Sequence, residues 1–422
     1  MSKNISPDEI KNKSPVLGFF SLLALVISSQ IGAGALSMPT VFAPLGISGF
    51  FAWITIGFVV LILAYIFAQL SIALPYTGGP HVYIKHAFGN ATAFFAGWLY
   101  WLVSWISTTI ILIECMGYLN QILHMDCLTV MLVGLIIWTG FNYLNYIGIQ
   151  QATQIEVALT IVKLLFFMFF ILISLKYFNI EHISSASFNI PAYKTGLASA
   201  MWCFIGLEVA TVPAGMVENP KTAIPRAIIV GTIIVIGIYI SSIIGVMGVV
   251  SHNELAQTAA PYALIAEHIF GPTIQMFFAL LVFFICAGSL NAWVLISGQV
   301  AAGLAEDKLL PKKFAELHNG IPYFGILISF VGVSLIWICG SYSVSLMEQM
   351  IDLINCTVPA FILIYMICCM AFIKIYKQVY NRLIGVIGIF SCACILYSTS
   401  LSIWLIILCL LLSGLPLRTM RD

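Results

Sequence analysis

The stretch Ile31-Gly32-Ala33-Gly34 interrupts an apolar segment that runs from residue 16 to residue 43. A second apolar segment, residues 195–217, is interrupted in the same way by Phe204-Ile205-Gly206-Leu207-Glu208. Glycine weakens a membrane helix, and lipid offers no replacement for the backbone hydrogen bonds that are lost. Such interruptions survive where they line a cavity or bind a ligand, and a matching pair in two halves of a chain is typical of secondary-transporter sites.

The composition indicates a membrane protein. Of the 422 residues, 61% are hydrophobic and 8% are charged, and the mean hydropathy is +1.07. Soluble domains do not have this composition, so the lipid bilayer is a necessary partner. The net charge of +1 gives no reason to expect a nucleic-acid partner. We expect residues 1–15 to be a cytoplasmic N-terminal segment that is not cleaved, and residues 16–422 to form a single transmembrane domain.

Twelve apolar segments are long enough to cross a hydrocarbon core of ~30 Å. They fall at residues 16–43, 47–74, 93–122, 127–145, 154–176, 195–217, 226–250, 273–301, 322–341, 346–373, 383–397 and 400–416. The chain is therefore predicted to be an all-α polytopic membrane protein with 12 transmembrane helices.

Basic residues favour an orientation with both termini in the cytoplasm. Only Lys176 and Lys194 then fall outside, and Lys163 lies within a span. An excess of Lys and Arg on the cytoplasmic side is the usual arrangement. The residues on that side are Lys3, Lys11, Lys13, Lys85, Lys221, Arg226, Lys308, Lys312, Lys313, Lys374, Lys377, Arg382, Arg418 and Arg421.

Two short connections repeat at the same offset as the two interruptions. Residues 79–89 follow the second span on the inner side, and residues 261–270 follow the seventh span on the outer side. Interruptions and connections that repeat after five spans predict a five-plus-five inverted repeat. We expect repeat one at about 16–176, repeat two at about 195–373, and two appended helices at about 383–416.

These motifs resemble the amino acid–polyamine–organocation superfamily, which has the leucine-transporter type of fold with helices 1 and 6 broken. Gly32-Ala33-Gly34 is similar to its helix 1 interruption, residues 75–83 (PYTGGPHVY) to its loop after helix 2, and residues 204–208 (FIGLE) to its helix 6. Glu218-Asn219-Pro220-Lys221 is similar to the turn into helix 7. The resemblance implies secondary active transport of amino acids by alternating access in the cell inner membrane, without a cofactor. Many members are homodimers.

Three further stretches resemble the basic amino acid/polyamine antiporters within that superfamily. They are residues 100–106 (YWLVSWI), 202–206 (WCFIG) and 289–293 (SLNAW). This likeness implies an exchanger of cationic amino acids or polyamines, of the arginine/agmatine or ornithine/putrescine type. It also implies that Trp202 and Trp293 wall the substrate.

Three positions bear on the substrate and on coupling. Ser29 and Thr108 stand where the arginine/agmatine antiporters have asparagine, so the preferred substrate stays open. Helix 5 reads Ile161-Val162-Lys163-Leu164-Leu165, which is similar to proton-coupled members in which a lysine occupies an ion position. Lys163 therefore supports the alternative of a proton-coupled symporter of neutral amino acids. Its ammonium is expected between helices 1 and 8, or else to snorkel toward the cytoplasm.

The interruptions predict how a zwitterion binds. Free N–H groups from about Gly34 onward attract a carboxylate, and the carbonyls of Ile31 and Phe204 can accept from an ammonium. The sixth span is expected to expose N–H groups in the same way. The alternative is that the glycines only permit close helix packing. The predicted substrate-binding residues are Ser29, Ile31, Gly32, Ala33, Gly34, Ser104, Thr108, Trp202, Phe204, Ile205, Gly206, Trp293 and Thr357.

Carboxylates within the spans are a second group of candidates. Glu208 lies beside an interruption near the bilayer centre, where an ionisable residue indicates function. We predict a role in proton coupling or gating for Glu208, together with Lys163; the alternative is that Glu208 only stabilises the broken helix. Glu114, Glu348 and Asp352 lie in outer parts of their helices. They predict either a negative vestibule that concentrates cations or a set of solvated interfacial groups.

Other classes of protein fit poorly. The histidines fall in predicted loops or interfacial segments, so no intramembrane constellation supports hydrolysis or a metal site. They are His81, His86, His124, His182, His252, His268 and His318. The sequence has no phosphate-binding loop for ATP-driven transport and no repeated filter of the kind that channels use. A membrane-embedded enzyme and a channel are the remote alternatives.

Overall fold

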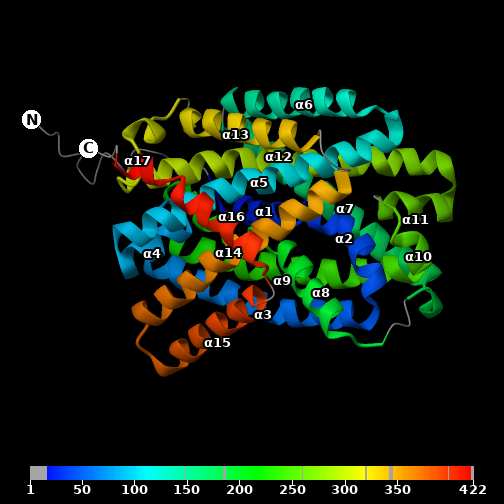
Figure 1. The fold of residues 1–422 in the computed structure, drawn as a ribbon, viewed down its shortest axis with the longest axis horizontal. Coiled ribbons are helices and arrows are strands. Elements are labelled where there is room, and N and C mark those ends of the chain that lie inside the picture. The colour runs from blue at the N-terminus through cyan, green and yellow to red at the C-terminus, as the bar shows by residue number, and fades with distance from the viewer. Residues whose placement is uncertain are drawn as a thin grey trace, which may run out of the picture.

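The computed structural model describes residues 17–147, 149–183, 187–258, 260–318, 321–341, 346–397 and 399–419. Apart from two isolated bridges, these residues form helices and turns, with no β-strand among them. Most of the long helices run roughly along the longest axis of the molecule (Figure 1). The predicted cytoplasmic segment, residues 1–15, lies outside the described residues.

The first apolar segment folds as two helices joined by a break. Helix α1 covers Phe19–Gln30 and α2 covers Ala33–Phe42, so the break falls at Ile31 and Gly32. Gly32 has φ −128° and ψ −140°, which lies outside the helical region. A 3₁₀ turn, η2 (Ala43–Leu45), then leads into α3.

The sixth segment breaks differently. Helix α8 (Ile190–Trp202) ends at the predicted interruption, but residues 203–217 form turns and two 3₁₀ helices, η4 (Val209–Thr211) and η5 (Ala214–Met216). Gly206 has φ +103°, and Pro213 has no N–H to donate. The regular second half-helix that we expected is absent, because these residues oppose α-helix formation along the segment.

The second half of the chain repeats the element order of the first. Each broken span is followed by a long helix, a short helix, and then three long helices. The first set is α3 (Gly46–Ala73), α4 (Pro80–Phe88), α5 (Asn90–Leu123), α6 (Cys127–Ile147) and α7 (Ile149–Tyr177). The second set is α9 (Pro220–Val249), α11 (Pro261–Phe270), α12 (Pro272–Glu306), α13 (Tyr323–Ser341) and α14 (Leu346–Ile375), with a four-residue α10 (His252–Leu255) before α11.

The lengths of the paired helices also match. Helices α5 and α12 have 34 and 35 residues, and α4 and α11 have 9 and 10. Figure 1 shows α4 and α11 at opposite ends of the molecule, as an inverted relation between the halves requires. Helices α15 (Val379–Leu396), α16 (Leu401–Leu412) and α17 (Leu415–Thr419) complete the chain as far as it is described.

Ten helices among the described residues are long and apolar enough to cross a membrane. The two predicted spans missing from that set are the first and the sixth. Their helices α1 and α8 have only 12 and 13 residues, which is too short for a crossing. The chain is polytopic, and the count of twelve spans stays a prediction.

The helices pack in two groups around the breaks. Helices α1 and α3 contact α9, and α3 also contacts α8; in the second group α5 contacts α12, and α13 contacts both. The start of the first broken span is tied to the end of the sixth through a parallel bridge between Leu17 and Val217. Leu17 N donates to Met216 O at 3.1 Å, and Glu218 N donates to Leu17 O at 3.0 Å.

Candidate functional site

The two breaks meet at a small cavity of about 20 Å³. It holds no more than about one water, so the site is closed in this conformation. The lining residues come from α1, α2, α5, α8, α12 and the sixth-span turns: Ser29, Gln30, Gly32, Gly34, Ser107, Ile111, Trp202, Ile205 and Trp293. Both predicted tryptophans are among them, although Trp202 and Trp293 lie far apart in the sequence.

The start of α2 gives the cavity its hydrogen-bond donors. The first N–H groups of a helix have no acceptor within that helix, and Gly32 and Gly34 both line the cavity. A Cβ on Gly34 would lie 2.8 Å from Cys203 Sγ, and one on Gly32 would lie 3.3 Å from Ser289 Oγ. The glycines therefore permit close packing of the broken spans. The N–H of Gly32 already donates to Gln30 O at 2.9 Å, so the donors beside the cavity are the N–H groups of the first turn of α2.

Backbone carbonyls at the breaks are already hydrogen-bonded in this closed conformation. Ser289 Oγ donates to Ile31 O at 3.3 Å, and the N–H of Leu207 donates to Phe204 O at 3.4 Å. A carbonyl oxygen has two lone pairs, so each can still accept from an ammonium.

Tyr239 on α9 joins the backbones of the two breaks. Its hydroxyl lies within hydrogen-bonding distance of the carbonyls of Gln30 and Cys203, at 3.2 Å from the latter. The ring of Phe204 packs against those of Tyr239 and Trp53 and does not line the cavity. A single side chain from outside the broken spans thus holds their interrupted ends together.

Glu208 is fully buried and is held from two other helices. The hydroxyl of Tyr100 on α5 donates to Glu208 Oε1 at 2.8 Å, and the hydroxyl of Tyr365 on α14 donates to Oε2. Both carboxyl oxygens therefore accept hydrogen bonds, which join the sixth-span break to α5 and α14.

Lys163 on α7 is also fully buried. Its ammonium donates to the hydroxyl of Ser28 on α1 and, at 2.7 Å, to the hydroxyl of Ser289 on α12. The ammonium thus lies between α1 and α12, the position expected for a cation site, and not toward the cytoplasmic surface.

Several predicted residues lie outside the cavity lining. Ser104, Thr108 and Thr357 donate their hydroxyls to carbonyls one turn earlier in their own helices. Ala33 begins α2, and Gly206 takes its positive φ beside Ser29.

The carboxylates in the outer parts of the helices separate into two kinds. Glu348 and Asp352 on α14 are exposed, which fits the alternative of solvated groups. Glu114 on α5 is only 5% exposed, so that alternative is wrong for it. The sequence did not reveal this burial, because α2 and α12, which cover Glu114, come from distant parts of the chain.

Three lining residues escaped the sequence analysis: Gln30, Ser107 and Ile111. Ser107 and Ile111 are one helical turn apart and share a face of α5. Helical spacing from the predicted Ser104 would have identified Ser107. For Gln30, the sequence indicates a place in the lining only through its position just before the break.

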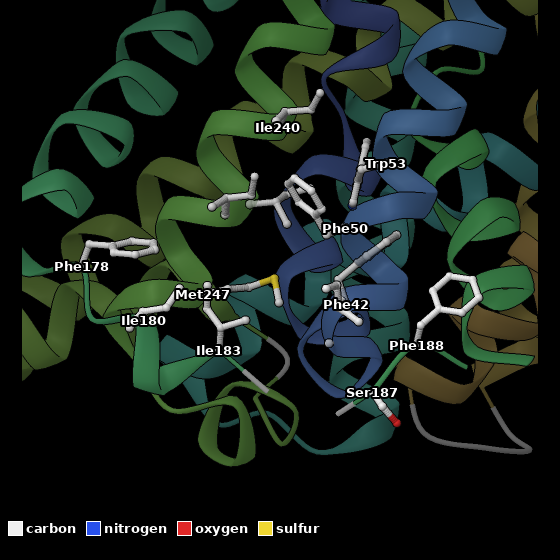
Figure 2. A pocket seen from close by; sticks show the side chains of 14 residues that line it. Phe42, Phe50, Trp53, Phe178, Ile180, Ile183, Ser187, Phe188, Ile240 and Met247 are labelled. Carbon is white, nitrogen blue, oxygen red and sulfur yellow. The ribbon is translucent and has the colours of Figure 1, made fainter. Parts of the chain in front are cut away.

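A second cavity, of about 680 Å³, lies between the start of α3 and the end of α9. Figure 2 shows that side chains from both helices and from the α7–α8 connection line it, and that nearly all are hydrocarbon. Phe50, Phe178 and Phe188 are 41–50% exposed there. This lining offers no charged partner for an ammonium or a carboxylate, so the cavity is not the zwitterion site.

Two interrupted spans that meet at an enclosed, partly polar cavity in a polytopic helical protein define a secondary transporter. The chain belongs to the amino acid permease family, whose model matches residues 17–416. It is a multi-pass membrane transporter and not an enzyme.

Three bacterial relatives are similar over most of their length. The chain is 27% identical over 424 residues to the putative arginine/ornithine antiporter of Bacillus subtilis (strain 168), covering 89% of each protein. It is 28% identical over 342 residues to the cadaverine/lysine antiporter of Escherichia coli (strain K12), covering 76% of this chain and 74% of the relative. It is 28% identical over 379 residues to the putrescine transporter PotE of Escherichia coli (strain K12), covering 86% and 85%.

Proposed function

We propose that this permease exchanges cationic amino acids or polyamines across the bacterial cytoplasmic membrane. The observation that carries the proposal is the closed cavity where both breaks meet between Trp202 and Trp293. Helix N-termini suit a carboxylate, and tryptophan faces attract ammonium and guanidinium groups. The relatives are named as transporters of arginine and ornithine, of cadaverine and lysine, and of putrescine, which supports the substrate class.

Alternating access follows from the two packed groups. The group that holds the breaks (α1, α3, α8 and α9) moves against the group built on α5, α12 and α13, so the cavity opens to one side and then to the other. Exchange arises when only the loaded carrier can reorient. The distribution of basic residues supports an orientation with both termini in the cytoplasm. We also propose a homodimer, from the resemblance alone, which light scattering of the purified protein tests.

The test is uptake of radiolabelled arginine, ornithine, lysine and putrescine into proteoliposomes. Vesicles are preloaded with each substrate or left empty, with and without an inward proton gradient. Uptake that requires internal substrate and ignores the gradient is the expected result. Failure of all four substrates in every condition would overturn the proposed substrate class.

A second candidate function is proton-coupled symport of neutral amino acids, which the contacts of Lys163 with Ser28 and Ser289 favour. An ammonium held there by hydroxyls can release its proton and empty the cation position. Symport predicts uptake of alanine or leucine into empty vesicles along an inward proton gradient. In a symporter, Lys163→Gln would remove the dependence of uptake on the proton gradient. In an exchanger, uptake depends on internal substrate and not on the gradient, and Lys163→Gln would leave it so.

A further inference from the structure

Glu114 on α5 is a buried carboxyl that the closed site does not use. The side chain is 5% exposed, and its Oε1 has no hydrogen-bond partner. Its Oε2 accepts a weak bond from Cys286 Sγ, at 3.7 Å, and the hydroxyl of Ser37 also interacts with the carboxyl. No salt bridge to Glu114 occurs among the described residues. A buried carboxylate without a cation is costly, and a cationic group that arrives from elsewhere would offset that cost.

Glu114 continues the polar wall of the cavity along α5. Ser107 and Ile111 line the cavity, and Glu114 follows Ile111 on the same helix face, about 4.5 Å further along the axis. The group therefore lies one turn beyond the cavity, toward the end of α5 at Leu123.

Two other helices reach the same level. On α2, Ser37 lies one turn beyond Gly34, which lines the cavity. On α12, Cys286 lies one turn before Ser289, whose hydroxyl contacts both Lys163 and the break at Ile31. The hydroxyl, thiol and carboxyl thus form a second polar layer, one turn beyond the cavity lining, and the carboxyl is the group of the three that can carry a full negative charge.

We propose that Glu114 binds the distal ammonium or guanidinium of a substrate whose α-amino and α-carboxyl groups lie at the break between Ile31 and Gly34. The inference rests on the proposed exchange of cationic substrates and specifies how the site selects them. A charge-assisted hydrogen bond to the unpartnered Oε1 would satisfy the buried carboxylate. The substrate-bound conformation must be wider than this one, because the cavity now measures about 20 Å³.

The site would then discriminate by charge at the end of the substrate side chain. Ornithine and lysine carry an ammonium that can reach the second layer, whereas norvaline and norleucine are similar in shape and lack it. A buried carboxyl left unpaired by a neutral substrate opposes binding. We therefore expect cationic substrates to be preferred over their neutral counterparts by at least about tenfold in affinity.

The test compares Glu114→Gln with the intact protein in proteoliposomes. Counterflow and competition binding are measured for lysine, ornithine, norleucine and norvaline. We expect the affinity of Glu114→Gln for lysine and ornithine to fall at least about tenfold, with norleucine unchanged or improved. The matched control is Glu348→Gln, which makes the same chemical change at an exposed position of α14 and should leave the preference intact.

A second variant keeps the test informative if Glu114→Gln does not fold. Glu114→Asp retains the charge but withdraws it by one methylene, so we expect the preference to shift from ornithine toward the longer lysine. An intact protein that transports cationic substrates, with both variants keeping the original preference, would overturn the role of Glu114 and leave the exchange function standing. An intact protein that transports only neutral amino acids would overturn both.

The same measurements distinguish a proton site from a cation site. If Glu114 instead carries a proton, Glu114→Gln would flatten the pH profile of uptake and leave the ratio of lysine to norleucine affinity unchanged. That outcome would overturn the proposal.

Discussion

Ser29 donates its hydroxyl to the carbonyl oxygen of Gly206 at 3.1 Å, across 177 residues of sequence. The same hydroxyl lies 3.0 Å from Val26 O, one turn back in α1. The end of α1 is thereby bonded to the backbone of the sixth-span break, directly beside the cavity that both line. This contact and the hydroxyl of Tyr239 link the two breaks directly.

Gly206→Ala is expected to impair both folding and transport. Its φ of +103° is unfavourable for any residue with a Cβ, and that Cβ would lie 3.0 Å from Ser29 Oγ. The strain amounts to about 1–3 kcal/mol, which a melting curve in detergent and a counterflow assay would detect. The matched control is Gly237→Ala in α9, where a Cβ would meet nothing within 4 Å; unchanged behaviour of both variants would contradict the argument.

Trp293→Ala is expected to weaken binding of a cationic substrate. A desolvated cation–π contact contributes about 2 kcal/mol, which corresponds to roughly 30-fold in affinity. Trp293→Phe keeps an aromatic face and should lose less. Equilibrium binding of radiolabelled arginine measures the effect, and Trp404→Ala on α16, which lies outside the cavity lining, should bind as the intact protein does. If Trp293→Ala bound arginine as tightly as the intact protein does, Trp293 would not contribute to substrate binding.

Glu208→Gln is expected to slow exchange at least about tenfold and to flatten its pH profile. Two tyrosine hydroxyls donate to this carboxyl, and an amide places an N–H₂ donor opposite one of them. A buried donor without an acceptor costs about 1–3 kcal/mol. The measurement is the rate of counterflow between pH 5 and pH 8, with Glu181→Gln at an exposed position as the control. A pH profile that persists in Glu208→Gln would assign the proton dependence to another group.

Asp307→Asn is expected to lower thermal stability at neutral pH. The carboxyl lies 2.5 Å from Lys85 Nζ and 3.3 Å from His81 Nε2, which tie α4 to the end of α12. Burial alone would raise its pKa, but these neighbours prevail and the pKa is lowered from 3.8. The stabilisation by the carboxylate is thus fully present above pH 3.8 and is lost as pH falls through the lower folded value.

The size of this effect is modest because the pair is partly exposed. We expect Asp307→Asn to lower the free energy of unfolding by about 1 kcal/mol and Tm by roughly 2 °C. This loss should not diminish between pH 8 and pH 5. Glu254→Gln is the matched control, since the contact between Glu254 and His268 is largely exposed and should contribute almost nothing. Equal Tm values for Asp307→Asn and the intact protein at pH 7 would refute the expectation.

Glycine and proline residues that interrupt or begin helices made much of this fold predictable. The break at Gly32 and the short helix Pro261–Phe270 follow from glycine and proline at fixed places, and the structure has both. The turns after Trp202 did not follow, because apolar composition indicates a span without distinguishing an α-helix from successive 3₁₀ turns. Pro213 was the available signal, since a proline at that position removes an N–H from the segment.

The site was predictable where its residues adjoin the breaks. Trp202 and Gly34 belong to the same stretches as the interruptions themselves. Ser107 and the burial of Glu114 depend on how α5 rotates against α2 and α12, which only tertiary packing determines. The contacts of Tyr100 and Tyr365 with Glu208 could not be predicted for the same reason, since the two tyrosines come from different halves of the chain.

The bridge between Leu17 and Val217 has a consequence for divergence among relatives. Its two hydrogen bonds use only main-chain atoms, so side-chain replacement leaves them in place, and a proline at residue 17 or 218 is the substitution that would remove a donor. Mutations can therefore accumulate at these positions without uncoupling the two broken spans. A link made only of backbone atoms does not depend on the side chains that flank it, so it can persist at the level of divergence, 27% identity, that separates this chain from a relative.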